Sequence, residues 1–260
     1  MDVEETKCSS GYGKPPWIFK GRALYQFHLV KAEIARAIIP KEFKLVEAFG
    51  YTLGGFFLAN YSESPFGTFD EGLSGIRLRL MPRVYVNSDE ACRHGRKEFG
   101  LPSHVGRFTK SVKAVSKRPQ RNDMDIHVAE IDGLVATNLY DIRLTSPVLK
   151  TNPLKWMSFG PNIKMSLPSF SGHTKDKPQL LKYSCQIECR VKPTSTAKVL
   201  RRLDQHNTSE SQNVELNESI EKREMSISAM LSKPILALEF NCLKMEVEPP
   251  VVVSKGSHGF

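Results

Sequence analysis

One short stretch of the sequence gathers most of the side chains that could act on a ligand: residues 92–105, CRHGRKEFGLPSHV. It holds His94 and His104, three basic residues and a carboxylate, set among two glycines and a proline. Histidine exchanges protons near neutral pH and can serve as a general acid or base, although a single histidine is more often structural. Ser103 could donate one hydrogen bond. Its activation as a nucleophile would need a base, and its neighbour His104 would face the opposite side of a strand.

The surrounding residues predict how this stretch is held. Ser88 or Asp89 can cap a helix, and acidic residues in the first turn suit the positive end of the helix dipole. Pro102 stops such a helix, since proline lacks the backbone donor that a helix interior requires. We therefore predict a helix over residues 89–99, then a turn, and a strand that begins near Val105.

The rest of the chain alternates apolar residues in short segments separated by turn residues, a pattern typical of strands. Phe19–Val30 predicts a strand that is partly buried on both faces. Further strands are predicted over residues 44–48, 51–61, 105–116, 125–130, 133–145, 180–191, 227–231, 235–240 and 242–247, and short helices over 31–39 and 193–202. Neither the strand–helix alternation of Rossmann or TIM folds nor an internal repeat appears. The pattern indicates a mainly β (α+β) protein built on an antiparallel sheet or barrel.

The charge of the chain raises the question of a nucleic-acid ligand, because 37 basic and 28 acidic residues give a net charge of +9. The basic residues are spread out, and no helix-turn-helix, zinc-finger or RNA-recognition pattern appears. We therefore expect no nucleic-acid partner; attraction to anionic lipid or acidic metabolites fits better. The sequence also lacks a metal-ligand cluster, a phosphate-binding loop, a GxSxG motif and a dinucleotide fingerprint, so no cofactor or metal is expected.

The cysteines, the hydropathy and the N-terminal residues indicate the redox state and the cellular location of the protein. The five cysteines are scattered, and Cys185 and Cys189 would lie on one face of a strand but too far apart for a disulfide, so reduced thiols are expected. No stretch approaches the roughly 18 apolar residues of a transmembrane helix. Residues 1–6 are acidic, which indicates neither a secretory signal nor a plastid transit peptide, so the sequence predicts a cytoplasmic location.

The pattern Gly-Arg-x-x-x-x-x-Pro at residues 95–102 resembles the acetoacetate decarboxylase superfamily. In that superfamily two lysines follow the proline, and one of them forms a Schiff base with the substrate. Ser103 and His104 stand at those two places, and neither can form the imine. The resemblance implies an acetoacetate decarboxylase-like antiparallel β-barrel or cone with a few short flanking helices and a central cavity. Residues 1–260 would form a single domain of this kind, with a mobile loop over 204–224 and a loose tail over 254–260.

Three other segments resemble the plant neoxanthin-deficient family: residues 9–17 (SSGYGKPPW), 49–56 (FGYTLGGF) and 86–92 (VNSDEAC). This resemblance extends over nearly the whole chain. It implies a role in making the carotenoid neoxanthin, a precursor of abscisic acid, and association with the plastid through that pathway. Residues 71–82 depart from the family pattern by being shorter and carrying two arginines; their alternation predicts an edge strand, and they put the local wall of any pocket in question.

The superfamily resemblance also implies a set of ligand-binding candidates: Arg22, Arg96, Ser103, His104 and Lys164. Arg22 matches a cavity arginine that assists a carboxylate substrate; the alternative is an exposed arginine at a strand end. Arg96 suits a salt bridge that holds the helix as well as a ligand contact. Lys164 is the lysine considered as a substitute imine former, and it would need burial or a neighbouring cation to lose its proton at neutral pH. The apolar residues of segment 162–172 could line a pocket or fill a core.

Our leading hypothesis is an accessory, non-catalytic protein required for neoxanthin and thereby abscisic acid synthesis. It would bind a carotenoid or other lipophilic small molecule in the cavity, or assist another protein of the pathway. The alternative is a lyase or isomerase that acts on a carbonyl substrate, with His104 and Lys164 as catalytic candidates converging with Arg22. A third hypothesis is a basic surface protein for nucleic acid or anionic lipid.

Overall fold

The computed structural model describes residues 13–39, 44–76, 80–114, 122–145, 160–202 and 223–253. Its first strands are β1 (Trp17–Lys31), β2 (Tyr51–Glu63), β3 (Phe69–Ile76), β4 (Leu80–Val86) and β5 (Ser103–Ala114). They are followed by β6 (Asn122–Asp132), β7 (Val135–Leu144), β8 (Asn162–Gly172), β9 (Leu180–Thr194), β10 (Lys198–Arg201), β11 (Lys233–Val247) and β12 (Val251–Val252). The helices are α1 (Ala32–Ile38), α2 (Asp89–Phe99) and a third over residues 223–230.

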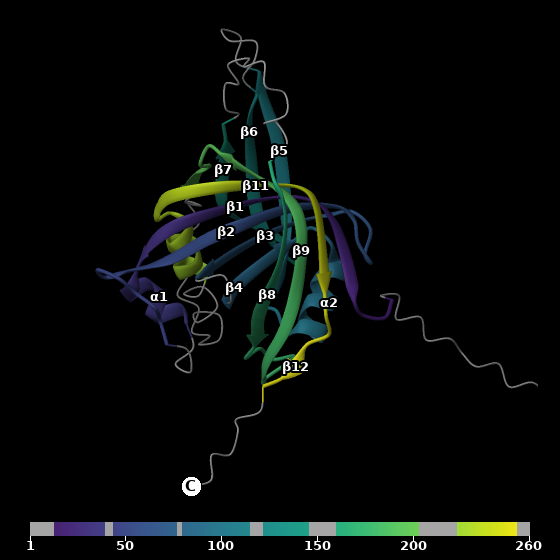
Figure 1. Ribbon diagram of the computed structural model, residues 1–260. Helices are drawn as coiled ribbons and strands as arrows, with labels where there is room; N and C mark the ends of the chain where they lie inside the picture. Colours follow the sequence, from purple (N-terminus) through teal and green to yellow (C-terminus); the bar gives the residue numbers. More distant parts are fainter. Residues whose placement is uncertain are drawn as a thin grey trace, which may run out of the picture.

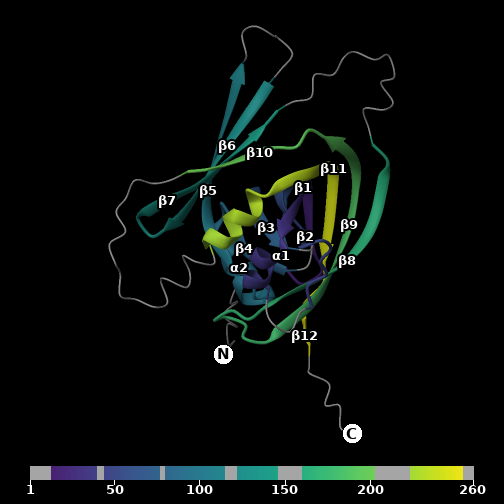
Figure 2. The ribbon, with the colours of Figure 1, turned by 90° about the vertical axis from the view of Figure 1, so that its left-hand side faces the viewer.

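The strands join in one large sheet in the order β10-β7-β6-β5-β4-β3-β2-β1-β11-β9-β12, with β8 paired to β9. Neighbouring strands run antiparallel except β4 and β5, which are parallel. The sheet curls so that β8 comes back beside β4, and α2 packs against β4 and β5 (Figures 1 and 2). Strands β5 to β7 extend away from this curl as a twisted wing (Figure 2). The fold is therefore mainly β, as predicted, with short helices at its margins.

The curled sheet packs a different core against each of its faces. Strand β1 shows this division, because successive side chains of a strand point to opposite faces. Phe19, Ala23 and Tyr25 face the inside of the curl, where they meet α2, β9 and β11. On the outer face, the buried Gln26 side chain hydrogen-bonds the backbone of Ala197, and His28 Nδ1 lies 2.7 Å from the carbonyl oxygen of Ser232. The inner face is the one that carries a hollow.

The helix predicted over residues 89–99 is confirmed, together with its caps. The Ser88 hydroxyl accepts a hydrogen bond from the backbone N–H of Ala91 at 3.2 Å. Gly100 ends the helix in the left-handed conformation, with φ of 58°, which glycine adopts without steric cost. The short helix expected over residues 31–39 is confirmed as α1, and the strand over Phe19–Val30 is confirmed within β1.

Three local predictions are wrong, and in two of them a tertiary contact decides the outcome. Residues 44–48 form no strand beyond a single bridge between Ala48 and Tyr51. Residues 198–201 form β10 rather than part of a helix, because they pair with β7. Residues 227–230 are helical rather than extended, since Ile227 and Met230, one turn apart, fill the outer core.

The segment that departs from the family pattern forms the end of β3 and the start of β4. It is not an edge strand, because β3 pairs with both β2 and β4. Residues 77–79 lie outside the described residues, as do the tail 254–260 and all but the last two residues of the expected loop 204–224. In the part of the chain that the structure describes, no helix is long and apolar enough to cross a membrane.

Candidate functional site

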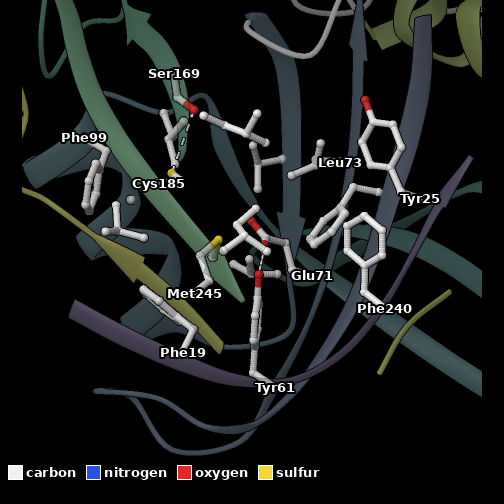
Figure 3. Close-up of a pocket in the computed structure, with 18 of the residues that line it drawn as sticks. Phe19, Tyr25, Tyr61, Glu71, Leu73, Phe99, Ser169, Cys185, Phe240 and Met245 are labelled. Carbon is white, nitrogen blue, oxygen red and sulfur yellow. Dashed lines mark hydrogen bonds between the residues drawn. The ribbon is translucent and has the colours of Figure 1, made fainter. Parts of the chain in front are cut away.

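The curl encloses a cavity of about 310 Å³ between its inner face and α2. Aromatic and aliphatic side chains from β1, β2, β3, β8, β9 and β11 make up most of its wall, among them Phe19, Phe57, Leu73, Met165, Ile187 and Phe240. Figure 3 shows several of these side chains converging on the hollow from strands far apart in the sequence. A concave, mostly apolar space with a few polar groups is the usual form of a small-molecule site.

Strand pairing explains why so many aromatic residues reach this space. Phe27 of β1 pairs with Gly55 of β2, and Tyr25 pairs with Phe57. A Cβ added at Gly55 would lie 2.2 Å from the carbonyl oxygen of Gln26, so only glycine permits this close approach of the two strands. From sequence alone, the Gly54-Gly55 pair within an aromatic run predicts either a close approach of two backbones or a bulge, and the close approach is found at Gly55.

One carboxyl group lies in the apolar wall. The Tyr61 hydroxyl donates a hydrogen bond of 2.8 Å to Glu71 Oε2, and Figure 3 shows the two side chains pointing toward one another. Burial raises the pKa of Glu71 to about 7, although the hydrogen bond from Tyr61 lowers it somewhat. Near neutral pH, Glu71 is therefore divided between a charged acceptor and a neutral group that can donate a proton.

Other polar groups of the wall are neutral. Ser169 and Cys185 lie 3.8 Å apart between Oγ and Sγ, and burial raises the pKa of Cys185 to about 11, which keeps the thiol protonated. His94 sits among the rings of Trp17, Phe66 and Phe99, with centroid separations from 4.8 to 5.6 Å. Burial lowers the pKa of His94 despite the nearby charge of Glu98, so its imidazole is uncharged at neutral pH.

The two residues at the lysine positions face opposite sides of the sheet, as predicted for neighbours in a strand. Ser103 is buried and lines the cavity, and its hydroxyl lies 2.7 Å from where a Cβ on Gly95 would be, so Gly95 makes room for it. Arg96 is exposed, and its Nε donates a hydrogen bond of 2.7 Å to the carbonyl oxygen of Ser103. Arg96 thus holds the turn that presents Ser103 and does not enter the cavity wall.

His104 belongs to a buried cluster of charges on the other face. Its Nδ1 lies 2.9 Å from Glu130 Oε1, and Arg83 Nε donates to its Nε2 at 3.2 Å. Because Nε2 accepts that bond, the proton resides on Nδ1, which donates to Glu130. Arg83 and Arg223 also approach the carboxylate, at 3.4 and 3.5 Å. His104 is therefore fully engaged on the face away from the cavity.

The predicted convergence of Arg22, His104 and Lys164 is not seen. Arg22 is exposed on β1 and is absent from the cavity wall. Lys164 points outward from β8, where its side chain is 74% exposed and its Nζ lies 3.1 Å from Glu188. Strand alternation is the reason, because Ile163 and Met165, on either side of Lys164, face the hollow. Among the described residues that line the cavity there is no lysine or arginine.

The sequence analysis missed Glu71 and Tyr61, the pair that gives the cavity its polar centre. A signal was present, because Glu71 shares the strand face of the apolar Leu73, which placed a carboxyl on a buried face. Because residues 71–82 depart from the family pattern, the sequence analysis did not use the alternation that puts Glu71 and Leu73 on one face of the strand. In the described part of the chain, no cluster of three or more His, Cys, Asp or Glu side chains could hold a metal ion.

Comparison with known proteins places this geometry in context. The chain is 52% identical to Protein NEOXANTHIN-DEFICIENT 1 of Solanum lycopersicum, over 99% of each chain, and 51% identical to the protein of that name in Arabidopsis thaliana, over 97% of this chain and 99% of the other. The tomato alignment spans 294 positions against 260 residues here, so that relative has segments that this chain lacks. No protein-family model matches.

Solved structures with a similar fold are more distant in sequence. The enduracididine biosynthesis enzyme MppR, complexed with pyruvate, superposes with a TM-score of 0.59 at 14% identity, over 97% of this chain and 95% of that one. Acetoacetate decarboxylase from Legionella pneumophila gives a TM-score of 0.57 at 14% identity, over 97% and 92%. These likenesses show the fold, which is acetoacetate decarboxylase-like.

Proposed function

This chain belongs to the plant NEOXANTHIN-DEFICIENT 1 family, and we propose that it supports neoxanthin formation, and thereby abscisic acid synthesis, by binding a carotenoid or a similar lipophilic molecule in its cavity. The observation that carries the proposal is the composition of the wall. It is aromatic and aliphatic, its described residues include no lysine or arginine, and its carboxyl group, Glu71, is half neutral at about pH 7. Such a wall favours a neutral, largely apolar ligand.

The polar centre defines how that ligand would be oriented. Near neutral pH, protonated Glu71 donates to an oxygen of the ligand, and ionised Glu71, already bonded to Tyr61, accepts from a hydroxyl. In an apolar surrounding either bond is strong, since a polar group left unpaired there is costly. The Tyr61–Glu71 pair thus selects ligands that carry a hydroxyl, epoxide or carbonyl oxygen at one end, as oxygenated carotenoids do.

Imine chemistry finds no support in the cavity. A Schiff base needs an uncharged amine at the substrate, and Lys164, the candidate from the sequence, lies outside the hollow beside Glu188. A keto-acid substrate would also bring a carboxylate into a wall whose described residues offer no cation. Borohydride reduction with pyruvate or acetoacetate is expected to leave the mass of the protein unchanged. A covalent adduct on any lysine would contradict the hypothesis that the protein is a non-catalytic, accessory protein.

Binding can be tested with violaxanthin or neoxanthin dispersed in mild detergent, followed by gel filtration and the absorbance of the carotenoid that elutes with the protein. We expect dissociation constants of roughly 10 μM or tighter, from burial of one apolar end group. The variant Met165→Trp places a larger ring in the hollow and should abolish binding. Ser166→Trp is its matched control, because Ser166 is the next residue of β8 and points outward.

The outcomes separate clearly. Loss of binding in Met165→Trp with retention in Ser166→Trp supports the cavity as the site. Equal binding by both variants would show that the ligand binds elsewhere on the protein. Absence of binding by the unmodified protein at its highest soluble concentration would contradict the ligand-binding proposal. Urea unfolding of each variant shows that both remain folded.

A further inference from the structure

The inner face of the sheet continues beyond the cavity as an exposed apolar surface. Phe27 is the last cavity residue of β1, and it pairs with Gly55 of β2 and Leu236 of β11. Two residues farther along the same face of β1 lies Leu29, which pairs with Leu53. Leu29, Leu53 and Leu236 are 37%, 37% and 43% exposed. The apolar wall of the cavity therefore continues to the solvent through Leu29, Leu53 and Leu236.

The turn that leads into β2 carries further exposed aromatic residues close to Leu53 in the chain. Phe49 is completely exposed, and its backbone is in the left-handed region with φ of 52°. A bulky residue there is unfavourable, and glycine or asparagine would fit the turn better. Tyr51, the first residue of β2, is also exposed and pairs with Lys31. We call the five residues Leu29, Phe49, Tyr51, Leu53 and Leu236 the mouth patch; Figure 1 shows the β2 end that carries the turn projecting beyond α1.

The charge around the mouth patch is positive. Lys233 pairs with Leu29 in the sheet, and Lys31 pairs with Tyr51. Described residues 29–53 together with 233–236 carry four cations and two carboxylates, namely Lys31, Arg36, Lys44 and Lys233 against Glu33 and Glu47. Each carboxylate is already engaged by a cation, Glu33 by Lys31 and Glu47 by Arg36. An apolar patch with a basic rim is the arrangement that binds anionic lipid surfaces.

We propose that the mouth patch docks on the surface of an anionic membrane, with Phe49 and its neighbours entering the headgroup boundary. The proposal rests on the proposed function in one respect, which is that the membrane would deliver a lipophilic ligand to the cavity. A cavity of about 310 Å³ is at the small end of ligand sites and suits one end ring of a carotenoid rather than the whole molecule. The remaining length would lie along the patch and in the lipid.

A second copy of the chain is the rival occupant, and two observations favour lipid. The patch is flanked by cations on both neighbouring strands, which would repel each other across an interface between identical faces. It is also continuous with a cavity whose wall lacks charged groups apart from Glu71 among the described residues, so that a lipophilic molecule could pass without entering water.

Vesicle sedimentation without any carotenoid tests the docking separately from ligand binding. Vesicles of phosphatidylglycerol should bind the protein, vesicles of phosphatidylcholine should bind it far less, and high salt should weaken binding. The double variant Phe49→Asn with Leu53→Ser should lower the partition coefficient roughly tenfold or more, because each apolar side chain contributes when buried in lipid. Lys233→Gln should lower it roughly fivefold.

Leu134→Asn is the matched control, because Leu134 is fully exposed in the turn between β6 and β7, on the wing away from the mouth patch. Its binding should equal that of the unmodified protein. Failure to bind phosphatidylglycerol vesicles, or equal losses in the control and the double variant, would overturn the proposal. So would a dimer in gel filtration that the double variant abolishes, which would assign the patch to a second copy.

The two proposals fail independently. If the protein binds vesicles but no carotenoid in detergent, the docking proposal is supported and the cavity-ligand proposal is contradicted. If it binds carotenoid in detergent but no vesicles, the cavity-ligand proposal is supported and the docking proposal is contradicted. Urea unfolding of the double variant guards against misfolding, and Phe49→Asn alone should be at least as stable as the unmodified protein, since asparagine tolerates the left-handed turn.

Discussion

Two carboxyl groups, Glu71 in the cavity wall and the buried Glu130, occupy opposite faces of the same sheet and have opposite electrostatic surroundings. Glu71 faces the cavity and has the Tyr61 hydroxyl as its hydrogen-bond donor, and burial raises its pKa to about 7. Burial alone would also raise the pKa of Glu130, but the hydrogen bond from His104 and the charges of Arg83 and Arg223 lower it overall. One carboxyl is poised between two protonation states, and the other is fixed as an anion.

This contrast distinguishes the candidate binding site around Glu71 from the structural ion-pair network around Glu130. Positive charges gather around Glu130, whose carboxylate lies within 3.5 Å of nitrogen atoms of Arg83, His104 and Arg223. Among the described residues, the hydrogen bond to the Glu71 carboxyl comes from Tyr61, and the rest of the cavity wall is mostly apolar and carries no cation. Perturbed pKa values are found at functional sites and in ion-pair networks alike, and the free space beside Glu71 is what favours a functional role for it.

The largest expected effect comes from removing the charge of Glu130. In Glu130→Gln the guanidinium of Arg83, whose side chain is 6% exposed, would lose its anionic partner. We expect the free energy of unfolding to fall by about 3–5 kcal/mol, measured by urea denaturation at pH 7. Glu63→Gln is the control, since the exposed pair with Lys20 should contribute about 0.5 kcal/mol or less. Equal losses in both variants would contradict a special role for the network.

The second effect depends on pH and concerns Glu71. The native state keeps this proton up to about pH 7, whereas the unfolded chain releases it near the ordinary value of 4.5, so stability falls as pH rises between these values. Glu71→Gln should remove that fall and be more stable than the unmodified protein by at most about 3 kcal/mol at pH 8, with little difference at pH 4.

Urea denaturation from pH 2 to 8 measures this difference, and the same series on Glu130→Gln extends the comparison to the acid side, where the contribution of Glu130 is lost. Because the pKa of Glu130 is lowered, its contribution is present above the unfolded value and is lost as pH falls. Glu130→Gln should therefore flatten the acid side of the profile and Glu71→Gln the neutral side. Identical profiles for the two variants would mean that the two carboxyls do not differ.

A smaller effect is expected from the donor to Glu71. Tyr61→Phe removes one hydrogen bond, at a cost of about 1 kcal/mol, and takes away the interaction that lowers the pKa of Glu71. The fall in stability with rising pH should move to a higher pH. Tyr25→Phe is the control, because Tyr25 lines the same cavity but stacks on Phe240, and it should leave that pH unchanged.

The smallest effect is expected outside both regions. Lys164→Ala removes a side chain that is 74% exposed and paired with an exposed Glu188. Its stability should change by about 0.5 kcal/mol or less, and carotenoid binding should be unaffected. A marked loss of binding in this variant would restore Lys164 as a ligand-binding residue and would contradict the site built around Glu71.

Much of the fold could be predicted locally. The helix over residues 89–99 follows from its cap, its acidic first turn and the glycine that ends it. The alternation of side chains along a strand also predicts that Ser103 and His104, the first two residues of β5, face opposite sides of the sheet. The failures at residues 198–201 and 227–230 involve short segments whose conformation is chosen by pairing with β7 or packing on the outer core.

By itself, the sequence determined the strand-rich class, the family and the loss of the imine-forming lysines, because these depend on residue identity and local periodicity. Only the tertiary structure decided which face of each strand encloses the hollow. That choice put Lys164 and Arg22 outside and brought Tyr61 and Glu71 together inside. The physical reason is that a side chain's pKa and reach depend on the neighbours that the curled sheet assembles from distant segments, and alternation along one strand cannot specify them.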